Sequence, residues 1–305
     1  MMKQNLKEMH QDRQSTRWRS LFKKYDKTKP KQIDSTLCLT CSDDLGVIRN
    51  GGRLGTRHGP EAILNILGSF AKRPHYPPLE IEEISIGNGG KISRDFDQNQ
   101  KNSIEHLKTL PFESYEKILM LGGGHDHIFP WLMAIDQQST PEDEIVIINL
   151  DAHLDTRNDQ HFHSGTPFRQ FDQQSSRSFH LWQVGIHSFA NPESNYHDFK
   201  RAQMRLFNSD STGLSQIQQT LAGMANPLVV LSLDADALNA SFMEGVSAVN
   251  PAGMSLDYLK EFLDLFGGAK YFGIYEYNPL FDNLSCKGAR SLAFLIERFL
   301  AKKKA

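Results

Sequence analysis

Several short polar motifs carry residues whose types and spacing fit the binding of divalent metals. They are Gly122-Gly123-Gly124-His125, Asp151-Ala152-His153-Leu154-Asp155, Asp234-Ala235-Asp236 and the single residue Glu276. Each motif follows directly after a short apolar run, where carboxylates are poor strand residues and are costly to bury unpaired. In an extended chain, residues two apart point the same way, so D-x-H-x-D and D-x-D each present their polar side chains together.

Together these motifs offer carboxylates and the imidazoles of His125 and His153, but no thiolate. Carboxylates brought to one place repel one another unless cations lie among them. A pair of divalent ions that share bridging carboxylates fits this set, and oxygen-rich ligation with some imidazole favours Mn²⁺ over a structural zinc. Each motif alone has an ordinary structural explanation, such as a solvated turn. Their joint occurrence, each next to an apolar run, favours a metal cluster.

Apolar, strand-like runs alternate along the chain with segments of helical period. The runs are Thr36–Cys41, Ile81–Ile86, Lys117–Leu121, Ile145–Leu150, His180–Ile186, Met204–Phe207, Leu228–Leu233 and Lys270–Tyr275. One helical segment starts at Gly59. Three others are Ser211–Met224, Ser255–Leu265 and Ser291–Ala301. This alternation predicts a three-layer α/β/α fold with a central, mostly parallel sheet of about eight strands. Active sites of such sheets lie beyond the carboxyl ends of the strands, where the polar motifs stand.

Length and composition limit the domain organisation and the partners. A length of 305 residues suggests about two domains, yet no linker or repeat divides the chain. We therefore expect one catalytic domain over residues 34–305 after a polar extension over residues 1–33. A net charge of −2 leaves no basic excess for nucleic acid, and no apolar run is long enough to cross a membrane. Residues 1–35 lack the apolar core of a secretory signal, so we expect a cytoplasmic protein.

The chain resembles the ureohydrolases, the family of arginase, agmatinase and formimidoylglutamase. The resemblance covers about Asp44 to Leu300 and is most specific at the polar motifs, with support from Asn50-Gly51-Gly52-Arg53 and Asn278-Pro279. It implies an arginase-like fold with two Mn²⁺ ions per subunit. One ion would be held by His125, Asp151, Asp155 and Asp234, and the other by Asp151, His153, Asp234 and Asp236. We also expect a homo-oligomer, of a size that the sequence does not specify.

The resemblance also implies catalytic roles. Two cations lower the pKa of a shared water, and Asp155 would hold the resulting nucleophile in line. Glu276 would orient a planar cationic amidine or guanidine by charge-assisted hydrogen bonds. The implied reaction is hydrolysis of the C–N bond of a linear amidine.

Details of the motifs favour the formimidoylglutamase branch. Gly122-Gly123-Gly124-His125 differs from the Gly-Gly-Asp-His form usual in arginase and agmatinase, and Gly245-Val246-Ser247-Ala248 resembles the formimidoylglutamase loop. Arg157 takes a position where related enzymes contact the substrate tail, and a guanidinium there suits a carboxylate. A surface-loop arginine is an equally ordinary interpretation. Agmatinases place a histidine proton shuttle directly before Gly165, where this chain has Ser164, and His163 is the displaced candidate for that role.

The expected substrate is therefore N-formimidoyl-L-glutamate, which would be cleaved to L-glutamate and formamide as in histidine degradation. The expected substrate-binding residues are Arg157, Ser164 and Gly165. Agmatinase, guanidinobutyrase and arginase activities are alternatives within the family. A catalytically retired, metal-binding regulatory or scaffold protein is the alternative of another class, and the intact set of metal ligands together with Glu276 argues against it.

Overall fold

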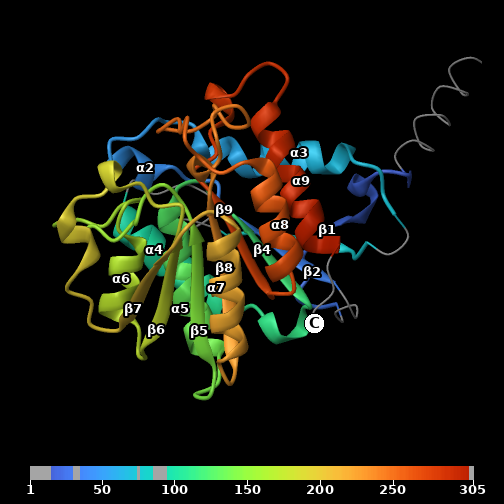
Figure 1. Ribbon diagram of the computed structural model, residues 1–305. Helices are drawn as coiled ribbons and strands as arrows, with labels where there is room; N and C mark the ends of the chain where they lie inside the picture. Colours follow the sequence, from blue (N-terminus) through green and yellow to red (C-terminus); the bar gives the residue numbers. More distant parts are fainter. Residues whose placement is uncertain (1–14, 30–34, 74–75, 85–94, 302–305) are drawn as a thin grey trace, which may run out of the picture.

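The computed structural model describes residues 15–29, 35–73, 76–84 and 95–301 (Figure 1). Its strands form one parallel sheet in the order β1-β3-β2-β4-β9-β8-β5-β6-β7. The strands are β1 Phe22–Lys24, β2 Thr36–Thr40, β3 Leu79–Glu83, β4 Lys117–Leu121, β5 Glu144–Leu150, β6 Phe179–Val184, β7 Ala202–Phe207, β8 Pro227–Asp234 and β9 Tyr271–Tyr275. The helices are α2 Leu45–Arg49, α3 Gly59–Ser69, α4 Phe96–Lys108, α5 Ile128–Gln138, α6 Pro167–Gln174, α7 Ser211–Ala222, α8 Leu256–Phe266 and α9 Lys287–Ala301.

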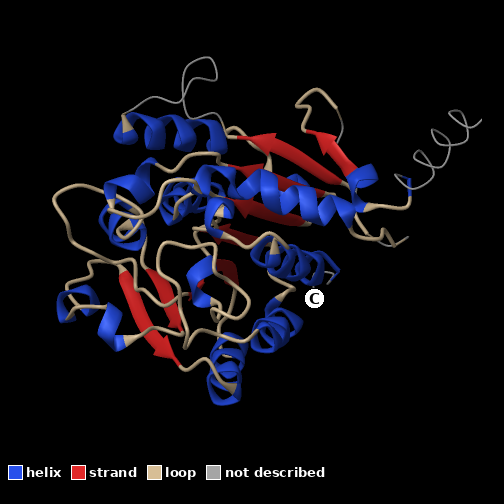
Figure 2. Ribbon diagram, turned by 90° about the horizontal axis from the view of Figure 1, so that it is seen from above, coloured by secondary structure: helices blue, strands red, loops and turns tan. Residues whose placement is uncertain are grey.

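Helices cover both faces of the sheet, which confirms the expected three-layer α/β/α fold (Figure 2). The central strands are mostly apolar because successive side chains point to opposite faces and helices cover both faces. In β5, Ile145 and Ile147 pack in one core cluster, whereas Val146 and Ile148 pack in the other. The strands are therefore buried on both sides.

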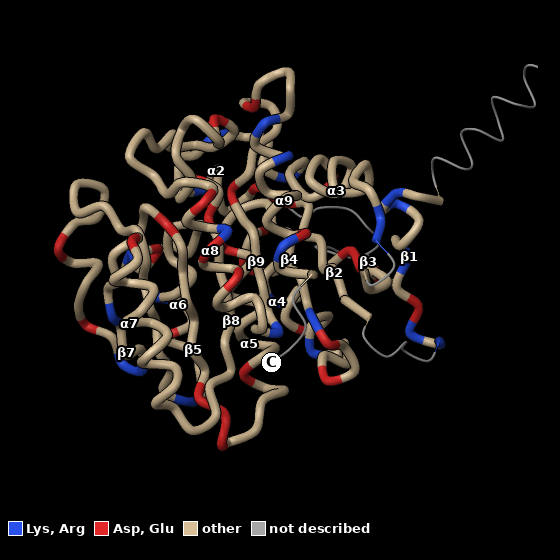
Figure 3. Tube along the Cα trace, turned by 45° about the vertical axis from the view of Figure 1, so that its right-hand side comes forward, with Lys and Arg blue, Asp and Glu red and all other residues tan. Residues whose placement is uncertain are grey.

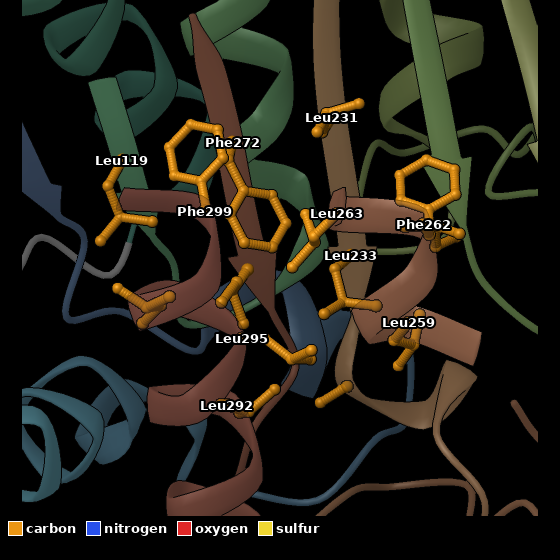
Figure 4. Packing of buried hydrophobic residues seen from close by; sticks show 14 of the residues in the cluster. Leu119, Leu231, Leu233, Leu259, Phe262, Leu263, Phe272, Leu292, Leu295 and Phe299 are labelled. Atoms are coloured by element: carbon orange, nitrogen blue, oxygen red, sulfur yellow. The ribbon is translucent and has the colours of Figure 1, made fainter. Parts of the chain in front are cut away.

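One core cluster lies under α8 and α9 (Figure 4). Phe299 of α9 packs against Phe272 of β9, with ring centroids 5.1 Å apart. Phe262 of α8 packs in the same cluster as Leu231 and Leu233 of β8. The opposite cluster contains Trp131 and Leu132 of α5 and Phe171 of α6, among other residues. Helix packing on both sides thus holds the central strands, and the residues that follow them, in fixed positions.

The helices expected from the sequence differ from the observed ones mainly at their ends. Helix α8 begins where Ser255 caps it, since the Ser255 hydroxyl accepts a hydrogen bond from the Tyr258 backbone. Helix α9 starts at Lys287, four residues before the expected Ser291, because the Asp282 carboxylate accepts bonds from the backbone of its first turn. Helices α4, α5 and α6 were not expected. Helix α5 is buried over most of its length, so it shows no polar stripe that would mark it as helical.

The sheet has one strand more than the eight expected from the apolar runs. Strand β1 pairs in parallel with β3 and lies within the segment expected as a polar extension. The sequence does not predict β1 because it is a short edge strand in which Lys23 and Lys24 are exposed. The expected run Ile81–Ile86 corresponds to β3, and its last two residues lie outside the described part of the chain.

Cysteines, charged residues and apolar helices bear on other kinds of partner. Cys38 and Cys41 are free and buried. Lys and Arg are interspersed with Asp and Glu along the described trace (Figure 3). None of the helices in the described ranges has both the length and the apolar character required to cross a membrane.

The segment before β2 contributes to the core through Trp18. Its side chain is fully buried and its ring lies 4.5 Å from that of Tyr76. Trp18→Ala is expected to lower the free energy of unfolding by about 3–5 kcal/mol, measured by urea denaturation, because it leaves a cavity. The control Leu284→Ala removes a fully exposed side chain and should change this value by less than about 0.5 kcal/mol. Equal stability of the Trp18 variant and wild type would show that this segment is dispensable.

Candidate metal centre

The topology of the sheet explains why the polar motifs meet. Strands β4, β9, β8 and β5 are consecutive neighbours, so their carboxyl ends lie side by side at one edge. His125 follows β4, Glu276 follows β9, Asp234 ends β8, and Asp151 follows β5. Because all these strands are parallel, four segments far apart in the sequence deliver polar side chains to the same place.

Glycines permit the close approach of the turn after β4. A Cβ on Gly123 would lie 1.7 Å from the carbonyl oxygen of Asp43, and one on Gly122 would lie 2.4 Å from the Tyr275 ring. Only glycine therefore fits at these two positions. Asp155 and Glu276 have left-handed backbone φ angles of 52° and 63°. Such conformations cost energy for non-glycine residues and are concentrated at functional sites.

Three carboxylates surround Nδ1 of the fully buried His125. The distances from this nitrogen are 2.9 Å to Oδ2 of Asp155, 3.2 Å to Oδ2 of Asp234 and 3.4 Å to Oδ2 of Asp151. One potential ligand atom from each of these four residues lies within 4.8 Å of the others, as metal coordination requires. This group matches the first metal site expected from the sequence.

A second group lies beside the first and shares Asp151 with it. Nδ1 of His153 lies 3.1 Å from Oδ2 of Asp236 and 3.6 Å from Oδ1 of Asp151. Asp151 thus turns one oxygen to each histidine, which is the arrangement that a bridging carboxylate needs. Asp234 does not belong to this second group. Its Oδ1 accepts a hydrogen bond from the Asp236 backbone at 2.9 Å. Its expected bridging role stays a prediction.

Buried polar neighbours orient the residues of the first group. Nε2 of His125 lies 2.8 Å from the Ser232 hydroxyl, so Nδ1 is the ring nitrogen that faces the carboxylates. The His125 ring also stacks on Tyr275, with centroids 4.8 Å apart. Asn149 donates a hydrogen bond to Oδ2 of Asp151 at 3.2 Å. The sequence assigned no role to Ser232 or Asn149. Each stands two residues before a ligand, Asp234 or Asp151, so the alternation of an extended chain could have indicated that it faces the same side.

Buried carboxylates lie close together in the two groups. Burial together with Asp236 and Asp151 raises the pKa of Asp234 well above its usual range. Burial likewise raises the pKa of Asp236 to about 6. Nδ1 of His125 and Oδ1 of Asp236 are buried and make no hydrogen bond with any described residue. Unpartnered atoms of this kind and an oxygen-rich donor set with imidazole fit a pair of divalent cations.

Glu276 lies against the first group from the end of β9. Its Oε1 accepts a hydrogen bond from the His125 backbone at 3.1 Å, and its own backbone donates to Gly123 at 2.8 Å. Burial, with further contributions from Asp155 and Asp126, raises the pKa of Glu276 to about 8. A carboxylate in this environment favours a cationic partner.

The expected substrate residues lie on the loop that follows Asp155. The Arg157 backbone donates to the Gly165 carbonyl at 3.1 Å, which closes the loop over residues 157–165. Nδ1 of His163 accepts from the Gly165 backbone at 3.0 Å, and Nε2 lies 2.8 Å from Oδ2 of Asp159. Both ring nitrogens of His163 are thus engaged within the loop. A proton-shuttle role for His163 stays a prediction, and this geometry does not favour it.

Known proteins of one family are similar to this chain in sequence and fold. The model of the arginase family matches residues 44–301. The chain is 30% identical over 266 residues to a formimidoylglutamase from Klebsiella pneumoniae, which covers 83% of this chain and 80% of that protein. The structure of formimidoylglutamase from Bacillus subtilis matches with a TM-score of 0.80 and 21% identity, over 94% of this chain and 91% of that one. The structure of a Trypanosoma cruzi formiminoglutamase variant with Mn²⁺ matches with a TM-score of 0.74 and 22% identity, over 93% of this chain and 96% of that one.

Proposed function

This chain belongs to the arginase family and is a metal-dependent hydrolase of C–N bonds, and we propose that its substrate is N-formimidoyl-L-glutamate. In the proposed reaction, water adds to the amidine carbon and the bond from this carbon to the glutamate nitrogen breaks. The nitrogen leaves with a proton as the amine of L-glutamate, and the carbon leaves as formamide. The pair of ligand groups that share Asp151 supports the hydrolytic chemistry, and Arg157, argued below, supports the choice of substrate.

We propose two Mn²⁺ ions at these groups, one with His125, Asp151, Asp155 and Asp234, and one with Asp151, His153 and Asp236. The Mn²⁺ of the Trypanosoma cruzi structure and the oxygen-rich donor set support this choice of metal. When bound, two divalent cations lower the pKa of water between them, so that a nucleophile forms near neutral pH.

Residues of the chain would then orient the reactants. Asp155 lies beside His125, and its carboxylate can accept a hydrogen bond from the attacking water and hold it in line. Glu276 can accept two charge-assisted hydrogen bonds from the planar amidinium, which places the amidine carbon over the ligand groups. These two roles require a carboxylate at both Asp155 and Glu276.

The tail of the substrate is the basis for choosing one family activity over the others. Arg157 is half-buried two residues after Asp155 and forms no ion pair with a carboxylate among the described residues. Its guanidinium can therefore bind a carboxylate of the glutamate moiety by two parallel hydrogen bonds. Relatives named formimidoylglutamase at about 30% identity support the same choice. An agmatine tail is cationic and would be repelled by Arg157.

The decisive assay compares N-formimidoyl-L-glutamate, agmatine, 4-guanidinobutyrate and arginine as substrates in the presence of Mn²⁺. We expect the first to have the highest kcat/KM. Preference for agmatine would overturn the proposed substrate, and turnover of none of the four would favour a retired regulatory relative. Gel filtration of the same sample would test the expected homo-oligomer.

Arg157→Ala is expected to lower kcat/KM for N-formimidoyl-L-glutamate about 10–100-fold, mainly through KM, because a charge-assisted hydrogen bond is lost. Formamidine, which has no tail, should be hydrolysed by the variant at nearly the wild-type rate. The matched control is Arg205→Ala, on the exposed strand β7. An Arg157 variant with wild-type kinetics for the glutamate substrate would make Arg157 an ordinary loop arginine.

A further inference from the structure

We propose that Asn50 is a positioning residue for recognition of the carboxylate tail, because it holds both the Arg157 guanidinium and the Ser164 hydroxyl. The inference rests on the proposed function and deepens it. Asn50 follows the last residue of α2, and this helix lies at the edge of the sheet where the polar motifs meet (Figure 1). The Asn50-Gly51-Gly52-Arg53 motif is part of the family resemblance, but no role followed from the sequence.

The chemistry of Arg157 determines how the Asn50 amide is oriented. Nη1 of Arg157 lies 2.8 Å from Oδ1 of Asn50. A guanidinium can only donate, so the amide atom facing it must be the oxygen. The amide nitrogen then faces Oγ of Ser164 at 3.2 Å and donates to it. Since Ser164 accepts this bond, its own O–H remains to donate to another group.

Backbone contacts keep these three side chains together. The Ser164 backbone donates to the Gly46 carbonyl of α2 at 3.2 Å, and the Asn50 backbone donates to the same carbonyl at 3.0 Å. A Cβ on Gly165 would lie 3.2 Å from Nδ2 of Asn50 and 3.4 Å from Cδ of Arg157. Because Gly165 has no side chain, the Asn50 amide can lie close to its backbone. Helix α2 and the loop after Asp155 are thus joined at Asn50.

The neutrality of Asn50 is important for this role. An amide orients Arg157 but leaves its positive charge uncompensated, whereas an aspartate at this position would neutralise it. The oriented guanidinium and the Ser164 O–H together form a donor set for a carboxylate. Pre-orientation of the donors reduces the entropy lost when the substrate binds. Asn50 thus favours an anionic tail without being required for the reaction at the amidine carbon.

The test compares Asn50→Ala and Asn50→Asp with wild type, using Mn²⁺-loaded enzyme and two substrates, N-formimidoyl-L-glutamate and formamidine. Asn50→Ala should raise KM for the glutamate substrate about tenfold, the effect of losing one neutral hydrogen-bond partner, with kcat changed less than about threefold. Asn50→Asp should raise this KM about 100-fold, since it cancels the Arg157 charge. Turnover of formamidine should change less than about twofold in both variants.

The control is Asn226→Ala. Asn226 is exposed, directly precedes β8 at the amino end of that strand, and donates a side-chain hydrogen bond to Asp143. This variant should leave both substrates unaffected. A wild-type KM for the glutamate substrate in both Asn50 variants would overturn the inference. The proposed function would still be tested separately, by Arg157→Ala and by the comparison of substrates. Equal losses with both substrates would also overturn it, because Asn50 would then only support the loop. If wild type itself rejects the glutamate substrate, both proposals fail, and this result is visible without any variant.

Discussion

Asp234→Asn is expected to lower kcat/KM by at least about 10³-fold, because it weakens the cation site that makes a water nucleophilic and stabilises charge in the transition state. Asp234 lies 3.2 Å from Nδ1 of His125 in the first ligand group and bonds the Asp236 backbone next to the second. Its loss should therefore affect both groups. Metal analysis of the purified variant should give clearly less than two Mn²⁺ per chain.

Thermal unfolding supplies an independent measurement of the same effect. The proposed binding of Mn²⁺ to the folded state should raise the Tm of wild type, and the rise should be much smaller for Asp234→Asn. Asp257→Asn is the matched control, since Asp257 is exposed in the first turn of α8. Full metal content together with full activity in the Asp234 variant would show that this carboxylate is not a ligand.

The sequence predicts which polar side chains converge at the carboxyl ends of the strands, because two kinds of regularity apply to them. Predominantly apolar runs such as Ile145–Leu150 are typical of strands covered on both faces, and parallel strands end at a common edge. Alternation in Asp151-Ala152-His153 then gives the direction of the side chains. The convergence of His125 with Asp151 and Asp155 follows from these rules without any knowledge of the loops.

Features that depend on irregular backbone were not predictable in this way. The bonds from Asn50 to Arg157 and Ser164 join parts of the chain more than 100 residues apart through loops without period. His163 illustrates the same limit, because its place before Ser164 suggested a shuttle, whereas its ring bonds the backbone of Gly165. Strand β1 was missed for a different reason, since an edge strand with two exposed lysines carries no apolar signal.

Glu276→Gln is expected to reduce turnover about 10²–10³-fold while both metals stay bound. The amide is isosteric with the carboxylate and can still accept the hydrogen bond from the His125 backbone. It lacks the negative charge that orients a cationic amidine, and truncating one partner of a buried charge pair typically costs about 3–4 kcal/mol. Because the chemistry loses an orienting charge and the ligand groups are unchanged, metal analysis should match wild type.

Stability should change in the opposite direction to activity. The Glu276 carboxylate is buried and lies near Asp155 and Asp126, so its charge destabilises the folded protein in the absence of substrate. The Tm of the metal-free Glu276→Gln variant should therefore equal or exceed that of metal-free wild type. Glu61→Gln, which changes an exposed residue at the start of α3, is the control and should alter neither turnover nor Tm. Depletion of Mn²⁺ in the Glu276 variant would instead place this residue among the metal ligands. A stable, metal-loaded and inactive variant would show that Glu276 orients the substrate and does not bind the metal.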